Sequence, residues 1–139
     1  MSRPGHKVLA VDFGEARTGL AVSDATGAVA RPLETVHARD VDEVRGRILE
    51  LAGRESVAEI VVGLPLTLRG ELGSQAQKTR QFVAHLAAGT ELPVSTFDER
   101  FTSKLARGTG ARKSAQKDDA VAAAHLLTYY LTWKDDRDA

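Results

Sequence analysis

Short apolar runs alternate with polar turns in the first part of the chain, a pattern that predicts strands. The runs cover residues 7–12, 18–23 and, more weakly, 28–36. The segments between them contain Gly14 and, at 24–27, Asp-Ala-Thr-Gly, and both have the length and composition of hairpin connections. We therefore expect three consecutive strands that pair in an antiparallel meander.

The hydrophobic period then changes to that of an amphipathic helix. Val41, Val44, Ile48 and Leu51 fall on one helical face, with charged residues opposite. The nearly continuous apolar run at residues 60–64 is typical of a strand buried on both faces, and Pro65 ends it. A helix followed by a buried strand is thus predicted after the meander.

The second half of the chain repeats this alternation. A second amphipathic helix is indicated by one apolar face, made of Ala76, Thr79, Phe82, Val83 and Leu86. Residues 93–97 predict the last strand, and a short helix is expected at 102–107. The final helix is expected to begin at the Asp118-Asp119 pair and to run through Trp133.

This order of elements predicts the fold class. Hairpins followed by helical crossovers indicate an α/β domain with a five-stranded mixed sheet and helices on both faces. The length of 139 residues suits one domain with one core, and we expect flexible ends at residues 1–6 and 134–139.

Composition adds limits on setting and partners. The hydrophobic content of 42% and the charged content of 27% are ordinary for a globular protein, and there is no cysteine for a disulfide or a thiolate metal site. Residues 1–7 lack the apolar run of a signal peptide, and no stretch has the apolar length of a membrane span. We therefore expect a cytoplasmic protein that does not enter a membrane.

Three acidic residues stand where one metal site can be built. Asp12 ends the first strand, Glu99 follows the last strand, and Asp119 opens the last helix. Carboxylates hold hard cations, and a cation held beside a basic segment is what an enzyme acting on phosphodiesters needs. Glu99 and its neighbour Asp98 should point to opposite sides, so only one of them is expected to reach the site.

Each acidic residue also has a simpler explanation. Asp12 followed by Gly14 suits a polar hairpin turn. Asp98 and Glu99 suit a capping arrangement for a following helix, with Thr102 or Asp98 as the N-cap. Asp118 and Asp119 suit a first helical turn, where the helix dipole favours acids by about 0.3–1 kcal/mol. Of these last two, Asp119 is the preferred site residue because small residues follow it and allow close packing on the sheet.

The net charge is zero, but the basic residues are unevenly placed. Residues 100–117 contain six basic residues and no acidic one. Such a segment can position a nucleic-acid backbone without reading its sequence. The six residues are Arg100, Lys104, Arg107, Arg112, Lys113 and Lys117.

Four motifs together resemble one family closely. They are VDFGEARTGLAVSD, VVGLPLTLRG, FDERFTS and KDDAVAAAHLL, in that order and across nearly the whole chain. The set is similar to that of the YqgF family, also called RuvX, described as pre-16S ribosomal RNA nucleases or Holliday-junction-resolvase-like proteins. The resemblance implies an RNase H-like fold, with which the order of strands and helices agrees.

The resemblance also implies a mechanism and a site. The family's catalytic acids fall on Asp12, Glu99 and Asp119. The implied chemistry is phosphodiester hydrolysis with Mg²⁺ or Mn²⁺, with two ions when substrate is bound. Arg17, Arg100 and Lys117 are implied substrate contacts. RuvC-type resolvases carry two acids one turn apart on the last helix, whereas this chain has Ala122 one turn after Asp119.

Several functions remain open at this point. The first is a nuclease that trims ribosomal RNA precursors, and the second is a resolvase of branched DNA, which requires a homodimer. Such a dimer would form through the first helix or the aromatic C-terminal helix. A third is an RNA-binding module without catalysis. The Asp-x-Gly and Thr-Gly pair also resembles the first phosphate loop of actin-like ATPases, but those need two such domains, for which this chain is too short.

Overall fold

The computed structural model describes residues 6–67, 69–100 and 119–138. The meander predicted from the N-terminal pattern is present as β1 (Val8–Asp12), β2 (Arg17–Ser23) and β3 (Ala30–His37). The helical crossovers follow as α1 (Val41–Arg54), β4 (Glu59–Leu64), α2 (Ser74–Ala88) and β5 (Val94–Asp98). The helix α5 (Asp119–Asp138) ends the described chain.

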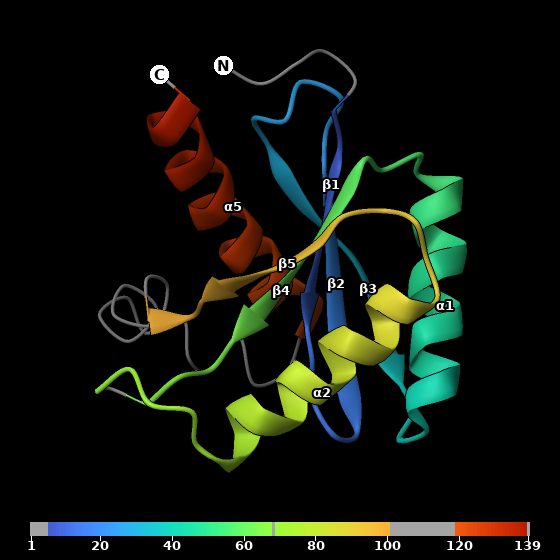
Figure 1. Ribbon diagram of the computed structural model, residues 1–139. Coiled ribbons are helices and arrows are strands. Elements are labelled where there is room, and N and C mark those ends of the chain that lie inside the picture. The colour runs from blue at the N-terminus through green and yellow to red at the C-terminus, as the bar shows by residue number, and fades with distance from the viewer. Residues whose placement is uncertain (1–5, 68, 101–118, 139) are drawn as a thin grey trace.

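The strands form one mixed sheet in the order β3-β2-β1-β4-β5. The pairs β1·β2 and β2·β3 are antiparallel, while β1·β4 and β4·β5 are parallel. Figure 1 shows α1 and α2 on one side of the twisted sheet and α5 on the other. The expected five-stranded mixed sheet with helices on both faces is confirmed.

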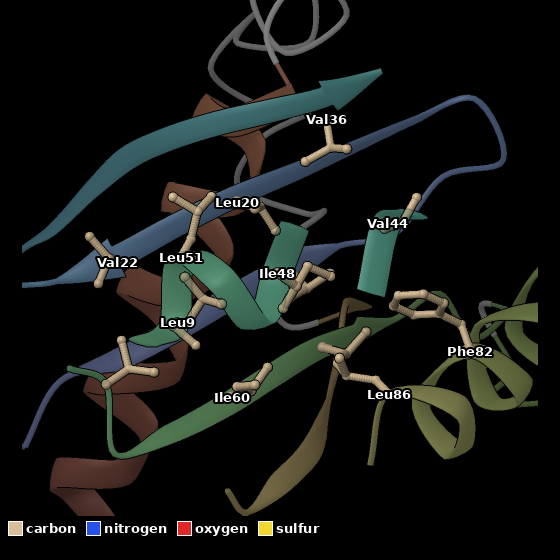
Figure 2. Packing of buried hydrophobic residues seen from close by; sticks show 14 residues of the cluster. Leu9, Leu20, Val22, Val36, Val44, Ile48, Leu51, Ile60, Phe82 and Leu86 are labelled. Carbon is tan, nitrogen blue, oxygen red and sulfur yellow. The ribbon is translucent and has the colours of Figure 1, made fainter. Parts of the chain in front are cut away.

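The first core lies between the sheet and the helices α1 and α2. Leu9, Leu20 and Ile60 of the sheet meet Ile48 of α1 and Leu86 of α2, all fully buried (Figure 2). Because side chains alternate across a strand, residues next to these in sequence face the other side. At about 25 cal/mol per Å² of apolar surface removed from water, this packing is the main force that holds the two helices on the sheet.

The second core lies under α5. Val8, Ala10 and Val61 of the sheet pack against Leu127 and Tyr130 of α5. The Tyr130 ring also lies edge-on to Phe97 of β5, with the ring centroids 5.5 Å apart. Two cores on opposite faces thus fix the sheet in a three-layer arrangement.

A buried carboxylate ties the far end of α5 to the start of β4. Glu59 is 8% exposed, and its Oε1 accepts a hydrogen bond of 2.6 Å from the Tyr130 hydroxyl. Its Oε2 contacts His6 Nε2 at 2.7 Å and the Lys134 ammonium. His6 and Lys134, which we expected in flexible ends, therefore both contact the sheet.

Three expectations about the elements need correction, and a fourth concerns residues that the structure does not describe. Val41 is 42% exposed and does not belong to the buried face of α1. The third strand begins at Ala30, after a turn in which the Asp24 carboxylate accepts from the amides of Ala28 and Val29. The predicted helix end at Trp133 is too early, since α5 continues to Asp138. The short helix expected at 102–107 lies outside the described residues.

Among the residues that the structure describes, there is no helix with the length and apolar character of a membrane span.

Candidate active site

The three acidic residues singled out from the sequence lie at the same end of the sheet. Asp12 is the last residue of β1, Glu99 directly follows β5, and Asp119 is the first residue of α5. Because β1, β4 and β5 are parallel neighbours, their carboxyl ends meet at one edge. The fold therefore gathers three chain segments that are far apart in sequence.

Two of these carboxyls have raised pKa values, to which the neighbouring acids contribute. Burial raises the pKa of Asp12 to about 6, and the negative charge of Asp119 adds to the shift. Burial likewise raises the pKa of Glu99 to about 7, with further contributions from Asp12 and Asp98. Carboxyls whose pKa values are raised by burial and by neighbouring negative charge are common at functional sites.

A glycine of β4 makes room for the Glu99 side chain. A Cβ atom on Gly63 would lie 2.6 Å from Glu99 Oε2 and 3.0 Å from a methyl of Leu126 in α5. Glu99 therefore lies over the α5 face of the sheet. Gly63 lies within β4, in the run that the sequence predicted as a strand.

Two residues of the meander fix the start of α5. A Cβ atom on Gly19 of β2 would lie 1.9 Å from the carbonyl oxygen of Asp119, so the helix start packs directly on the strand backbone. The Thr35 hydroxyl of β3 accepts a hydrogen bond of 3.1 Å from the Ala120 amide. This bond satisfies one of the amides that every helix leaves free in its first turn. Sequence reasoning missed both roles because the residues meet only in the folded chain.

Arg17 is the predicted substrate contact that the structure brings to the acids. Its Nε lies 3.2 Å from Asp119 Oδ2, and its side chain is 49% exposed. An exposed ion pair of this kind contributes little to stability and is easily exchanged. Arg17 can therefore leave Asp119 for another anion without a large cost.

Arg100 and Asp98 form a separate pair. The Asp98 carboxylate accepts from the Arg100 backbone amide at 2.9 Å and from two of its guanidinium nitrogens, at 2.8 Å and 2.6 Å. These bonds hold the pKa of Asp98 below its usual range. The expectation that only one of Asp98 and Glu99 reaches the acidic cluster agrees with this arrangement, while the helix that Asp98 was suggested to cap lies outside the described residues.

The rest of the predicted basic segment lies outside the described residues. This applies to Lys104, Arg107, Arg112, Lys113 and Lys117, and also to Asp118. Of the six basic residues, only Arg100 is described, and its guanidinium lies beside Gly70 in the loop after β4.

The acidic cluster fits a divalent cation by its chemistry. Carboxylate oxygens are the ligands that Mg²⁺ and Mn²⁺ prefer, and a bound cation would favour the charged carboxylates, which burial and, to a smaller extent, mutual repulsion disfavour. Among the described residues, no three acidic or histidine side chains are close enough to enclose an ion as they stand. One oxygen of the cluster, Asp119 Oδ2, lies 3.2 Å from Arg17 Nε.

Comparison with known proteins shows to which family this chain belongs. A family model described as RuvX, Holliday junction resolvase, matches residues 6–133. The chain belongs to the RuvX family. A protein of Rubrobacter xylanophilus named "Putative pre-16S rRNA nuclease" is 43% identical over 136 residues, which cover 94% of this chain and 96% of that protein. One of Chloroflexus aurantiacus with the same name is 40% identical over 130 residues, covering 89% of this chain and 85% of its own length.

Solved structures agree on the fold of this RuvX chain. The T. thermophilus RuvC structure in complex with a Holliday junction substrate superimposes with a TM-score of 0.61 at 20% identity. The match covers 93% of this chain and 96% of RuvC. The RNase H-like fold inferred from the motifs is thereby confirmed, and RuvX is a nuclease family of phosphodiester hydrolases.

Proposed function

We propose that this chain is a metal-dependent nuclease that processes the 5′ end of pre-16S ribosomal RNA in the cytoplasm. The observation that carries the proposal is the convergence of Asp12, Glu99 and Asp119 on one end of the sheet. The raised pKa values of Asp12 and Glu99 support it, because they reflect carboxyls buried near other negative charge. The names of relatives that are 43% and 40% identical support the choice of substrate.

The three carboxylates would hold Mg²⁺ or Mn²⁺, with two ions when substrate is bound. Bound metal would activate a water molecule and stabilise the leaving oxygen of the phosphodiester. Asp12 and Glu99 supply rigidly placed oxygens, since one ends a strand and the other lies packed over Gly63. Asp119 supplies the third carboxylate from a helix start that Gly19 and Thr35 hold against the sheet.

Basic side chains would hold the substrate backbone. Arg17 is placed to exchange Asp119 for a substrate phosphate, because it is half exposed and already beside the acids. We assign the same role to Arg100 and to the remaining basic residues of the segment 100–117, Lys104, Arg107, Arg112, Lys113 and Lys117. Their contacts would add affinity that falls with salt and would not choose a sequence.

A second candidate substrate is branched DNA. The description of the matching family as Holliday junction resolvase favours it. Cutting a symmetric junction requires a homodimer that presents two sites. Trp133 of α5, 39% exposed beside Phe97 and Tyr130, offers an aromatic surface for such a dimer, and α1 offers the other. Ala122, in place of a second acid on the last helix, argues for weaker binding of a second ion.

A third candidate belongs to another class, an RNA-binding module without catalysis. It should bind nucleic acid equally well without metal and without Asp12. The nuclease should instead lose cutting when Asp12 is replaced by Asn, while its binding stays or tightens because a negative charge is removed.

One cleavage experiment separates the three candidates. A labelled pre-16S ribosomal RNA fragment and a four-way DNA junction are each incubated with Mg²⁺, Mn²⁺ or EDTA, using wild type and Asp12→Asn. Metal-dependent cutting of the RNA that is lost in the variant is the expected result. Preference for the junction would favour the resolvase. If neither substrate is cut although binding is intact, the enzyme assignment is overturned.

A further inference from the structure

A cavity lies on the face of the sheet that α1 and α2 cover, opposite the face on which the acidic cluster lies. It has a volume of about 460 Å³, and its lining includes Phe13 and Phe82. Phe13 directly follows Asp12, yet it packs against the core under α1 and α2, whereas Asp12 interacts with Asp119 of α5. The acids and the cavity therefore flank the carboxyl end of β1 from its two sides.

The inner wall of this cavity is aromatic. The rings of Phe13 and Phe82 stack with their centroids 4.2 Å apart and an interplanar angle of 11°. Phe82 is 2% exposed and anchors the pair in the core, while Phe13 is half-buried. Val41 completes the apolar part of the lining and, although it is the first residue of an amphipathic helix, is 42% exposed. An apolar wall that stays partly open to solvent suits a planar apolar group.

The mouth of the cavity carries cations. Lys78 of α2 pairs with Glu15 of the β1–β2 turn, and Arg39 lies close enough to Glu15 to help lower the pKa of that carboxyl. Lys78 and Glu15 are 55% and 54% exposed, so their ion pair is weak and readily exchanged. Among the described lining residues, the cations Lys78 and Arg39 outnumber the one carboxylate, Glu15. The lining residue His85 pairs with the Asp42 carboxylate at 2.7 Å. Lys78 and Arg39 can therefore attract an anionic group.

An aromatic wall and a cationic mouth together match the two halves of a nucleotide. A base stacks on an aromatic ring whatever its sequence, and a phosphate pairs with Lys or Arg. A simple anion would not need the aromatic wall, and an apolar ligand would not need the cations. A nucleic-acid strand bound at the acidic cluster lies beside the carboxyl end of β1. A nucleotide next to the one being cut can therefore reach around this end to the cavity on the α1 and α2 side of the sheet.

We propose that this cavity receives one unpaired nucleotide of the strand being cut, adjacent to the phosphodiester at the acidic cluster. The proposal rests on the nuclease function proposed above. Such a cavity would make the enzyme require a single-stranded substrate, because a paired base cannot enter the cavity without leaving its partner.

The test measures binding of single-stranded RNA of about 12 nucleotides, within the range of site sizes for such binding. Each RNA of a series lacks one base, and all are tested in the Asp12→Asn background, where no cutting occurs. One abasic position is expected to weaken binding at least about fivefold. In a protein that also carries Phe13→Leu, the loss at that position should disappear while the other positions stay unchanged. A thermal melt checks that this variant is folded.

A matched pair of surface variants tests the same cavity without touching the core. Gln81 of α2 lines the cavity, and Gln75 lies on the same helix outside the lining; both are exposed. Gln81→Glu should weaken RNA binding several-fold more than Gln75→Glu, which adds the same charge. Equal binding by the two variants, or an absence of any position-specific abasic loss, overturns the proposal.

The outcomes separate this proposal from the nuclease function. Metal-dependent cutting by wild type together with equal binding by the two Gln variants removes the cavity site and keeps the nuclease. A Phe13-dependent abasic loss in a protein that cuts nothing keeps the cavity as a nucleotide site and removes the nuclease.

Discussion

Thr35 of β3 accepts a hydrogen bond of 3.1 Å from the backbone amide of Ala120, at the start of α5. The two residues are 85 positions apart in sequence. The bond caps the helix that carries Asp119, so an edge strand remote from the acids in sequence sets the position of one of them. Gly19 of the neighbouring strand lets the helix backbone approach to the same point.

We expect Thr35→Val to lower the cleavage rate with little effect on nucleic-acid binding. The variant keeps the side-chain shape but loses the oxygen, and the loss of a cap typically costs about 0.5–2 kcal/mol of stability. A displaced Asp119 can reduce the rate by up to about 10²-fold. Single-turnover cleavage and a binding titration separate the two effects. Thr35→Ser retains the oxygen and should keep most of the activity; an equal loss in both variants would contradict the capping role.

Gly63→Ala should impair the site more than the fold. The new Cβ would lie 2.6 Å from Glu99 Oε2, so the carboxylate must move, and overpacking costs about 1–3 kcal/mol. Gly46→Ala is the matched control, because nothing lies within 4 Å of its Cβ and Ala is the better helix former by about 1 kcal/mol. Thermal melts and cleavage rates of both variants check this. An unchanged rate for Gly63→Ala would show that Glu99 tolerates displacement.

Without metal, stability should fall as pH rises from about 4 to about 7. Asp12 and Glu99 have pKa values of about 6 and 7 in the folded chain, above their ordinary 3.8 and 4.5. The folded state thus binds more protons than the unfolded state in this window, and stability is lost as they dissociate. At pH 8 in EDTA, Asp12→Asn should therefore be more stable than wild type by about 1–3 kcal/mol, since each pKa unit corresponds to about 1.4 kcal/mol.

Chemical denaturation at pH 5 and pH 8 measures this dependence. Glu34→Gln serves as a control of opposite sign, because the hydrogen bond from Arg47 lowers the pKa of Glu34. The contribution of Glu34 is present at neutral pH and is lost as pH falls through its depressed pKa, so this variant should lose stability at pH 8. Added Mn²⁺ should stabilise wild type and not Asp12→Asn. A wild type whose stability in EDTA rises between pH 5 and pH 8 in parallel with Asp12→Asn would contradict the assigned pKa shifts.

Arg17→Gln should have opposite effects on metal and on substrate. Its guanidinium contacts Asp119 Oδ2, so its removal frees a carboxylate oxygen and should strengthen Mn²⁺ binding to the protein alone. The same change should weaken nucleic-acid binding and flatten its salt dependence, because one phosphate contact is lost. Calorimetric Mn²⁺ titration and binding at two salt concentrations measure the two effects. Weaker metal binding in the variant would show that Arg17 supports the site rather than competing for it.

The sequence predicted the sheet, and it singled out three acids that the structure brings to one end of that sheet, because both inferences depend on local patterns. Alternating apolar runs specify strands, and a carboxylate at a strand end is visible without a structure. The sequence did not reveal the roles of Gly19, Gly63 and Thr35, since each depends on which strand lies next to which helix. Val41 was wrongly assigned to the buried face of α1 for a related reason. Its spacing from Val44 and Ile48 fits that face, but Val41 is the first residue of the helix and lies beyond the core, where it lines the cavity.

The central claim is that Asp12, Glu99 and Asp119 act together on one phosphodiester. The most direct measurement is the metal-dependent cleavage rate of Asp12→Asn, Glu99→Gln and Asp119→Asn, beside Glu91→Gln, an exposed control in the segment between α2 and β5. Each of the three site variants is expected to lose at least about 10²-fold in rate while still binding nucleic acid, and the control is expected to cut like wild type. Wild-type cutting by any one of the three site variants would contradict the account.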